Sequence, residues 1–369
     1  MKAIIVGAGI AGLAIGWRLA QAGTEVEIYD RGLAGRGATW AAAGMIAPSA
    51  ELRGESEELA QFARRSRAAW PGFAAELEAE SACTIGYSEP GSLIMAFDDA
   101  RAHVLEQRAG RLTSSGVAAE WLAPPLLRKR EPLLSSELRG ALHIPDDAQV
   151  DNRLAGEALR IALARRNIVV RENTEVRGLL IAEERVRGVM CAGGAVPGDA
   201  VIVASGAWLN AFGGATAELP PVTPVKGQMV AVQPSEEVSL PRQLLWGENV
   251  YLVPRGGRVL IGATVEDAGF DTSVSREACS RLVSAATRIV PALAGWRISE
   301  MWAGLRPRAP DGAPVIGACA VKGLYVAGGQ FRNGILFAPA VADAMRRIVL
   351  TSQPVSEIRS FDPARFNAG

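Results

Sequence analysis

Histidine is scarce in this sequence of 369 residues, which contains only His103 and His143. A histidine-based catalytic triad or a histidine-rich metal site is hard to assemble from two such residues, because each needs several fixed side chains at one place. We therefore predict no metal site. Both histidines are interpreted as surface or packing residues.

Cysteine is also rare, and its four occurrences are far apart, without any Cys-x-x-Cys spacing: Cys83, Cys191, Cys279 and Cys319. Isolated cysteines of this kind are typical of reduced thiols in a cytosol. The simplest interpretation of all four is that they are small buried hydrophobic residues. The cysteine pattern therefore predicts a cytoplasmic protein.

Net charge and long apolar runs are missing as well. The 39 basic and 39 acidic side chains cancel to +0, so nothing indicates a polyanionic partner such as nucleic acid. Hydrophobic residues make up 49% of the chain, yet no uninterrupted apolar run reaches the roughly 20 residues that a membrane helix requires. We predict no nucleic-acid partner and no stable membrane insertion, and we expect a small-molecule ligand.

The N-terminus has the pattern of a strand, a helix and a second strand. "KAIIVGAG" is an apolar run that ends in glycine, "IAGLAIGWRLAQAG" has helical spacing and a glycine stop, and "TEVEIYD" alternates in polarity. Further strands are predicted in "NIVVRENTEV", "RVRGVMCAGG", "AVIVASGAWLN" and "GLYVAGG". "NVYLVPRGGRVLIGATV" predicts a hairpin that turns at Gly256 and Gly257.

Strands of the buried, parallel type thus occur at both ends and in the centre of the chain, with an antiparallel portion between them. The sequence predicts an α/β protein, in which a Rossmann-like dinucleotide domain carries an inserted α+β substrate domain on a largely antiparallel sheet. We assign residues 1–85, 145–218 and 305–369 to the dinucleotide domain. Residues 86–144 and 219–304 are assigned to the substrate domain.

The glycines of "GAGIAG" satisfy the pattern Gly-x-Gly-x-x-Gly between the first strand and the first helix. Gly7 permits a tight turn, Gly9 lets a pyrophosphate approach the backbone, and Gly12 allows close packing of helix on strand. Asp30 follows Gly12 by eighteen positions, near the roughly 20 expected for a carboxylate that bonds the ribose hydroxyls. These residues predict a bound dinucleotide, which can be FAD or a nicotinamide dinucleotide.

Five motifs distinguish FAD from a nicotinamide dinucleotide. "GAGIAGLAIGWRLAQAG", "ATWAAAGM", "VIVASGAW", "GLRPRAPDGAPVIG" and "GLYVAGGQFRNGILFAPA" together resemble the glycine oxidase branch of the D-amino-acid oxidase family, over essentially the whole chain. The resemblance implies non-covalent FAD between an FAD-binding domain and a smaller substrate domain. Some relatives tether the flavin through a cysteine, but Cys319 lies further along the chain than expected and is interpreted as a structural thiol.

The resemblance also implies which residues contact FAD. Asp30 and Arg31 would lie at the adenosine ribose, and Val176 would contact the adenine side. Residues 38–39 would lie near the phosphates and residues 43–45 beside the isoalloxazine. The complete predicted set is Gly7, Gly9, Ile10, Ala11, Gly12, Asp30, Arg31, Ala38, Thr39, Ala43, Gly44, Met45, Val176, Gly329, Gln330, Asn333, Gly334, Ile335 and Leu336.

Arg332 precedes Asn333 and Gly334, from which the helix "ILFAPAVADAMRRIVL" is predicted to begin. The first turn of that helix would direct unpaired N–H groups and a positive dipole end at whatever lies above the sheet. If the flavin pyrimidine edge lies there, this turn stabilises negative charge on the reduced ring. We therefore expect the helix to be core, its first turn to serve the cofactor, and Arg332 to face the substrate cavity.

Arg306, in "GLRPRAPDG", is predicted to lie in a rigid connection between a strand and Pro307. A guanidinium offers two parallel donors that match a carboxylate. In the resembling family the matching arginine binds the substrate carboxylate, a tyrosine that matches Tyr251 adds a hydroxyl bond, and Arg332 matches a further arginine of the site. The structural alternative for Arg306 is a salt bridge to Asp311.

The resemblance implies an oxidase of glycine and other small primary or secondary amino acids. Hydride transfer to flavin N5 would give an imine, which hydrolyses to glyoxylate and ammonia, and oxygen would be reduced to hydrogen peroxide. In the family this imine supplies the thiazole of thiamine, and members are often tetramers, so a homo-oligomer is expected as well. A quinone-linked D-amino-acid dehydrogenase, an oxidase of sarcosine or another small amine, and a non-enzymatic dinucleotide-binding protein remain open alternatives.

Overall fold

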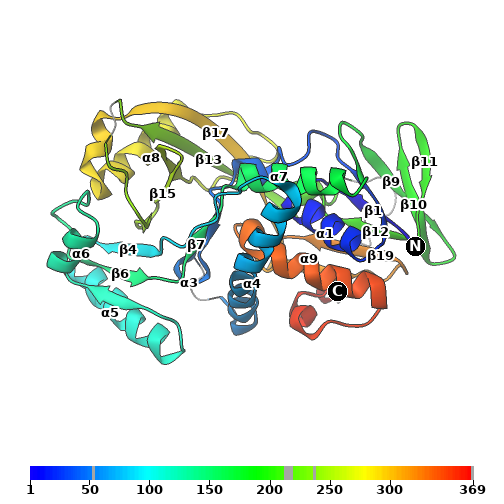
Figure 1. The fold of residues 1–369 in the computed structure, drawn as a ribbon, viewed down its shortest axis with the longest axis horizontal. Coiled ribbons are helices and arrows are strands. Elements are labelled where there is room, and N and C mark those ends of the chain that lie inside the picture. Colours follow the sequence, from blue (N-terminus) through cyan, green and yellow to red (C-terminus); the bar gives the residue numbers. More distant parts are fainter. Residues whose placement is uncertain (52–54, 212–218, 236–237, 367–369) are drawn as a thin grey trace.

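The structure of the protein, a computed structural model, describes residues 1–51, 55–211, 219–235 and 238–366. Two parts lie side by side along the long axis of the molecule (Figure 1). One part contains α1 (Ile10–Gln21) and α9 (Gly334–Thr351), and the other contains α8 (Arg276–Ile289). Over the described residues, no helix is both long and apolar enough to cross a membrane.

A sheet of six strands, counted over the described residues, forms the centre of the first part, in the order β18-β19-β12-β1-β2-β8. The neighbours from β19 to β8 pair in parallel, whereas β18 pairs with β19 antiparallel. The central strands are buried on both faces, which explains their continuous apolar sequences. The bounds are β1 (Lys2–Val6), β2 (Glu25–Tyr29), β8 (Val169–Arg171), β12 (Ala200–Val203), β18 (Val315–Ala318) and β19 (Leu324–Gly328).

Helices cover one face of this sheet and a small antiparallel sheet covers the other. The aromatic side chains of Trp17, Trp70 and Phe337 are completely or almost completely buried in the core beneath the helices. On the opposite face, Val186 and Val189 pack against the six-stranded sheet. The covering elements are α1, α4 (Glu57–Ser81), α7 (Asn152–Arg165) and α9 on one side and β9 (Val176–Ala182), β10 (Arg185–Cys191) and β11 (Gly194–Pro197) on the other.

The second part is built on a larger sheet, to which the described residues contribute eight strands in the order β17-β13-β16-β15-β14-β4-β6-β5. All neighbours pair antiparallel except β14 and β4. α8 buries Cys279, Leu282 and Ile289 in the core on one face. The bounds are β4 (Ser92–Ala96), β5 (Glu120–Leu122), β6 (Gly140–Ile144), β13 (Thr223–Gln233), β14 (Leu244–Trp246), β15 (Tyr251–Arg255), β16 (Arg258–Gly262) and β17 (Arg297–Arg308), with α5 (Asp99–Ser114) and α6 (Pro124–Arg130) beside the sheet.

Short elements connect the two parts. β3 (Met45–Ile46) pairs with β7 (Ala148–Gln149), and α2 (Ala38–Ala41) contacts both α7 and β17. α3 (Pro48–Glu51) lies between these parts in Figure 1. The chain therefore passes repeatedly between the two sheets.

The division into two domains remains our proposal, and the sheet memberships support it. All strands of the six-stranded sheet fall in residues 1–85, 145–218 and 305–369. Strands of the eight-stranded sheet fall in residues 86–144 and 219–304, but β17 continues to Arg308. Residues 305–308 therefore belong to the eight-stranded sheet, which we call the substrate-side sheet, and not to the dinucleotide domain to which we assigned them.

The sequence patterns predicted most elements in place, including the hairpin of β15 and β16 around Gly256 and Gly257. "NIVVRENTEV" holds the short strand β8 and only the first residue of β9, because the chain leaves β8 and begins β9 in another sheet. Arg306 was expected in a connection after a strand, but it lies within β17, where it pairs with Val225. The strand continues past Gly304 because β13 provides a partner along its whole length.

Candidate active site

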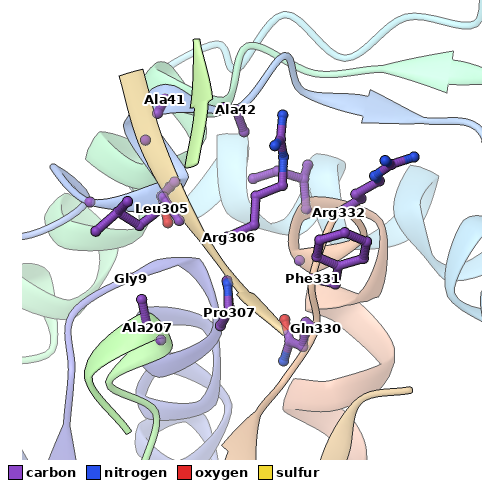
Figure 2. Close-up of a pocket in the computed structure, with 18 of the residues that line it drawn as sticks. Gly9, Ala41, Ala42, Ala207, Leu305, Arg306, Pro307, Gln330, Phe331 and Arg332 are labelled. Atoms are coloured by element: carbon purple, nitrogen blue, oxygen red, sulfur yellow. The ribbon is translucent and has the colours of Figure 1, made fainter. Parts of the chain in front are cut away.

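One cavity of about 1100 Å³ runs along the junction of the two parts. Its walls include the glycine loop at Gly9, the turn before α9 at Gln330 and Arg332, and the β17 residue Arg306. Figure 2 shows this arrangement, with Gly9 and Ala207 in the lower part of the view. The side chains of Arg306 and Arg332 point toward the top. The cavity is thus continuous from the first helix to the substrate-side sheet.

The glycine loop is shaped by close backbone contacts. Gly7 has a φ of 109°, which side chains disfavour, and a Cβ there would lie 2.4 Å from the carbonyl oxygen of Ala204. A Cβ at Gly12 would lie 1.9 Å from the Gly7 carbonyl oxygen. Gly9 caps α1 at the cavity wall, and the Ile10 amide donates to Thr39 Oγ1 at 2.8 Å. The N-terminus of α1 therefore faces open space with its dipole.

Asp30 follows β2 and receives two backbone hydrogen bonds. The Ala8 amide donates to Asp30 Oδ2 at 2.7 Å, and the Gly32 amide donates to Oδ1 at 2.8 Å. These bonds fix the carboxylate beside the glycine loop while each oxygen keeps a further lone pair. The neighbouring Arg31 guanidinium lies 5.1 Å from the centre of the Trp208 ring, an arrangement typical of a cation–π contact.

Residues 43–45 line the cavity next to the half-buried guanidinium of Arg255. Gly44 has a φ of 75°, and a Cβ there would lie 2.0 Å from the Val150 carbonyl oxygen. Arg255 donates to the Ala43 carbonyl oxygen and, at 2.8 Å, to Asn152 Oδ1. Burial lowers the pKa of Arg255 to about 10, and the nearby Asp151 opposes this shift. The guanidinium thus holds the Ala43–Gly44 segment through its main chain.

Polar atoms without partners gather at the C-terminal end of the six-stranded sheet. Ser205 Oγ, Gln330 Nε2 and Asn333 Oδ1 are buried and make no hydrogen bond to the residues that the structure describes. Ser205 and Gln330 line the cavity, and Asn333 caps α9, whose first turn contains no acidic residue. Buried polar groups nearly always have partners, so Ser205 Oγ and Gln330 Nε2, which face the cavity, indicate a polar ligand.

Arg306 and Tyr251 lie at the substrate-side end of the cavity. Arg306 Nη1 donates to the Thr264 carbonyl oxygen at 3.0 Å and to that of Lys226 at 3.4 Å. Loss of hydration raises the pKa of Tyr251, and the Arg306 charge opposes this shift. The Tyr251 hydroxyl therefore stays protonated above its ordinary pKa of 10.0 and can donate a hydrogen bond.

Two glycines make room for these side chains. A Cβ at Gly227 would lie 2.2 Å from Arg306 Nη2, and a Cβ at Gly262 would lie 2.5 Å from the Tyr251 hydroxyl. Neither glycine has a positive φ, so the close approach of the neighbouring side chain explains them better than backbone conformation. We did not predict either residue, although an isolated glycine inside a strand pattern can indicate such an approach.

Arg332 is exposed and lines the cavity. Its guanidinium lies 5.1 Å from the centre of the Phe331 ring and makes no ion pair within the described part of the chain. Arg306 does not bind Asp311, which instead accepts from Arg365 Nε at 2.8 Å. The salt-bridge alternative for Arg306 is therefore wrong, and two guanidinium groups face the cavity without a carboxylate partner among the described residues.

Comparison with known proteins identifies the family. A family model described as FAD dependent oxidoreductase matches residues 2–348. The protein is a member of this FAD-dependent family. A glycine oxidase of Geobacillus kaustophilus is 36% identical over 93% of this chain and 92% of its own. The crystal structure of glycine oxidase from that organism superposes with a TM-score of 0.93 at 32% identity, covering 99% of both chains.

A bifunctional protein ThiO/ThiG of Trichormus variabilis is 33% identical over 98% of this chain. Only 55% of that relative is covered, so the chain spans about half the length of the bifunctional relatives it matches.

The described residues fit FAD, the cofactor of this family. The cavity offers a glycine loop at a helix N-terminus for the pyrophosphate and the Asp30 carboxylate for the ribose. The unpaired atoms of Ser205 and Gln330 would supply polar contacts at the sheet end.

Most predicted site residues line this cavity, but four do not. Gly12 and Gly329 are packing glycines, and Asn333 caps α9 just behind the wall. Leu336 is buried in the core, where its carbonyl oxygen accepts from Ser66 Oγ and Trp70 Nε1. The lining residues are Gly7, Gly9, Ile10, Ala11, Asp30, Arg31, Ala38, Thr39, Ala43, Gly44, Met45, Val176, Tyr251, Arg306, Gln330, Arg332, Gly334 and Ile335.

Proposed function

We propose that the protein oxidises glycine and other small primary or secondary amino acids, with oxygen as the electron acceptor. The observation that carries the proposal is the position of Arg306, which faces the same cavity as the glycine loop and has no carboxylate partner among the described residues. A guanidinium in such a position matches the carboxylate of an amino acid. Glycine oxidases that align along almost the whole chain support this substrate class.

Bound FAD would supply the redox chemistry, in which N5 of the isoalloxazine accepts a hydride and the electrons pass to oxygen. The protein contributes orientation. Arg306 holds the substrate carboxylate, the protonated Tyr251 hydroxyl adds a hydrogen bond, and Arg332 adds positive charge. The substrate then loses hydride from its α-carbon and a proton from its nitrogen to become an imine, which water hydrolyses to glyoxylate and ammonia. Such a reaction depends mainly on positioning and exclusion of water.

The physiological setting that we propose is synthesis of the thiazole of thiamine, as the family resemblance implies. The match to proteins named ThiO/ThiG agrees with this setting. We also propose a cytoplasmic location, since Cys83, Cys191 and Cys279 stand outside disulfides. Fractionation of the host cell tests the location.

The test of the activity is peroxide production by the purified yellow protein with glycine, sarcosine, D-alanine and D-proline. The flavin spectrum is recorded without oxygen in parallel. Peroxide with glycine supports the proposal. Bleaching of the flavin by a D-amino acid without peroxide in air would favour a quinone-linked dehydrogenase, and peroxide with sarcosine alone would favour another amine. If no substrate bleaches the flavin, the substrate assignment is wrong.

A further inference from the structure

The chain after β16 makes a contact that bears directly on the substrate anchor. Thr264, the second residue of this segment, presents its carbonyl oxygen to Arg306 Nη1 at 3.0 Å. The Lys226 carbonyl oxygen lies 3.4 Å from the same nitrogen. Two main-chain oxygens from different segments therefore orient the guanidinium, so any shift of either segment moves it.

Lys226 joins these two segments. Its backbone exchanges hydrogen bonds with Glu266, each of 3.0 Å. Its side chain is only 5% exposed, and Nζ donates to Asp271 Oδ2 at 2.6 Å. A buried ammonium is costly unless it is paired. The exposed Asp271 carboxylate is the nearer partner of Lys226, and Glu266 Oε2 lies 3.9 Å from the same Nζ.

A second set of hydrogen bonds fixes the same segment from β13. The Gln228 amide donates to Thr264 Oγ1 at 2.8 Å, and Thr264 Oγ1 donates to Glu266 Oε1 at 2.5 Å. Gln228 Nε2 also donates to Glu266 Oε1, at 2.8 Å. Gln228 is buried, and the amide of Ser275 donates to its Oε1 at 2.6 Å. Every member of this set has a partner, which favours a single arrangement of the segment.

We propose that Lys226, Asp271 and Glu266 are positioning residues that hold the segment 264–273 so that its main chain aims Arg306 at the substrate carboxylate. None of the three side chains needs to touch the substrate for this role. The inference rests on the proposed function, because it assumes that Arg306 binds a carboxylate.

Burial raises the pKa of Glu266, but the hydrogen bonds from Thr264 and Gln228 and the Lys226 charge outweigh this effect. The pKa of the Glu266 carboxyl therefore lies below its ordinary value. The bond to Lys226 is the main cause that lowers the pKa of Asp271 to about 2. Both acids are therefore ionised at neutral pH, as the network requires.

The experiment compares Asp271→Asn with Asp267→Asn in the FAD-loaded protein. Asp267 is an exposed acid of the same segment without an ion pair to the described residues, so it is the matched control. Glycolate, a carboxylate that resembles glycine, is titrated while its perturbation of the flavin spectrum is followed. We expect Asp271→Asn to weaken glycolate binding and raise KM for glycine about 10- to 100-fold, since small misplacements at a site have effects of this size. FAD retention should stay as in the wild type.

Two further variants separate positioning from general damage. Asp271→Glu restores the charge and should return glycolate binding to within about threefold of the wild type. Glu266→Ala removes the acceptor of Thr264 and Gln228 and should weaken glycolate binding as Asp271→Asn does. Unchanged glycolate binding in both Asp271→Asn and Glu266→Ala overturns the proposal. The proposal is also overturned if Asp271→Asn and Glu266→Ala lose FAD and thermal stability together with glycolate binding, and Asp271→Glu does not restore them. That result indicates a structural role.

Failure of the underlying function gives a different result. In that case the wild type itself shows neither a flavin perturbation by glycolate nor peroxide with glycine. If the wild type passes both tests, the outcome for the variants decides the positioning role alone.

Discussion

At the scale of single residues, the proposed function depends most on Arg306. Replacing it with Ala removes the guanidinium that faces the cavity, and the carboxylate then lacks its bidentate partner. We predict that KM for glycine rises by about two to three orders of magnitude, the range of a lost charged hydrogen-bond pair, while FAD stays bound. Steady-state kinetics measures the change. Arg308→Ala, two residues along β17 and outside the cavity lining, is the control. If KM for glycine is unchanged in Arg306→Ala, Arg306 does not bind the substrate.

Gly227, which lies beside the Arg306 guanidinium, allows a finer test. A Cβ at Gly227 would lie 2.2–2.4 Å from three guanidinium atoms, so Gly227→Ala forces the flexible end of Arg306 aside and leaves the strand in place. We predict that KM rises at least about tenfold with little loss of stability. Kinetics and thermal unfolding together check this. Gly72→Ala in α4, where a Cβ meets nothing within 4 Å, should leave the kinetics unchanged and raise thermal stability slightly, because alanine favours a helix more than glycine does. If Gly227→Ala leaves KM for glycine unchanged, the position of the Arg306 guanidinium is not critical.

At the scale of elements, the turn between β1 and α1 gives a separable prediction for the cofactor. Gly9 has an ordinary φ of −76°, and a Cβ there meets only Thr39 Oγ1, at 3.4 Å. Gly9→Leu should therefore fold but fill the groove where the pyrophosphate would lie. We predict a folded, colourless protein, measured by the ratio of flavin to protein absorbance after gel filtration. Gly9→Ala is the control and should keep part of its flavin. A fully loaded Leu variant would argue against the phosphate loop.

Elements with local sequence signals were predictable, and close contacts between distant segments were not. The glycine loop and α1 follow from periodicity and glycine spacing within about 20 residues. Arg306 came from a resemblance, and its place inside β17 depends on pairing with β13, some eighty residues earlier. Lys226 and Asp271 carry no local motif, because their role exists only once β13 and the segment after β16 meet. Trp208 was missed for the same reason, since Arg31 reaches it only in the fold.

At the scale of the whole molecule, Asp147 links the two parts near the β3–β7 pairing. It lies just before β7, with Ser92 of the substrate-side sheet and the Ser49 backbone of α3 as hydrogen-bond partners, and its Oδ2 has no partner among the described residues. Complete burial raises the pKa of Asp147 from 3.8 to about 7, against the effect of the bond to Ser92 and of the Arg67 and Arg108 charges. The folded protein therefore binds this proton more tightly than the unfolded chain.

The consequence is a pH dependence of stability with a defined sign. Between pH 3.8 and about 7 the unfolded chain releases the Asp147 proton while the folded protein keeps it, so this residue lowers the free energy of unfolding as the pH rises. Asp147→Asn removes that dependence. We predict that its Tm, relative to the wild type, increases between pH 4.5 and pH 8, measured by thermal unfolding with FAD bound. The exposed neighbour variant Asp146→Asn should show no such trend. A constant Tm difference across this range would mean that Asp147 ionises in the fold as it does in water, and that the junction tolerates its charge.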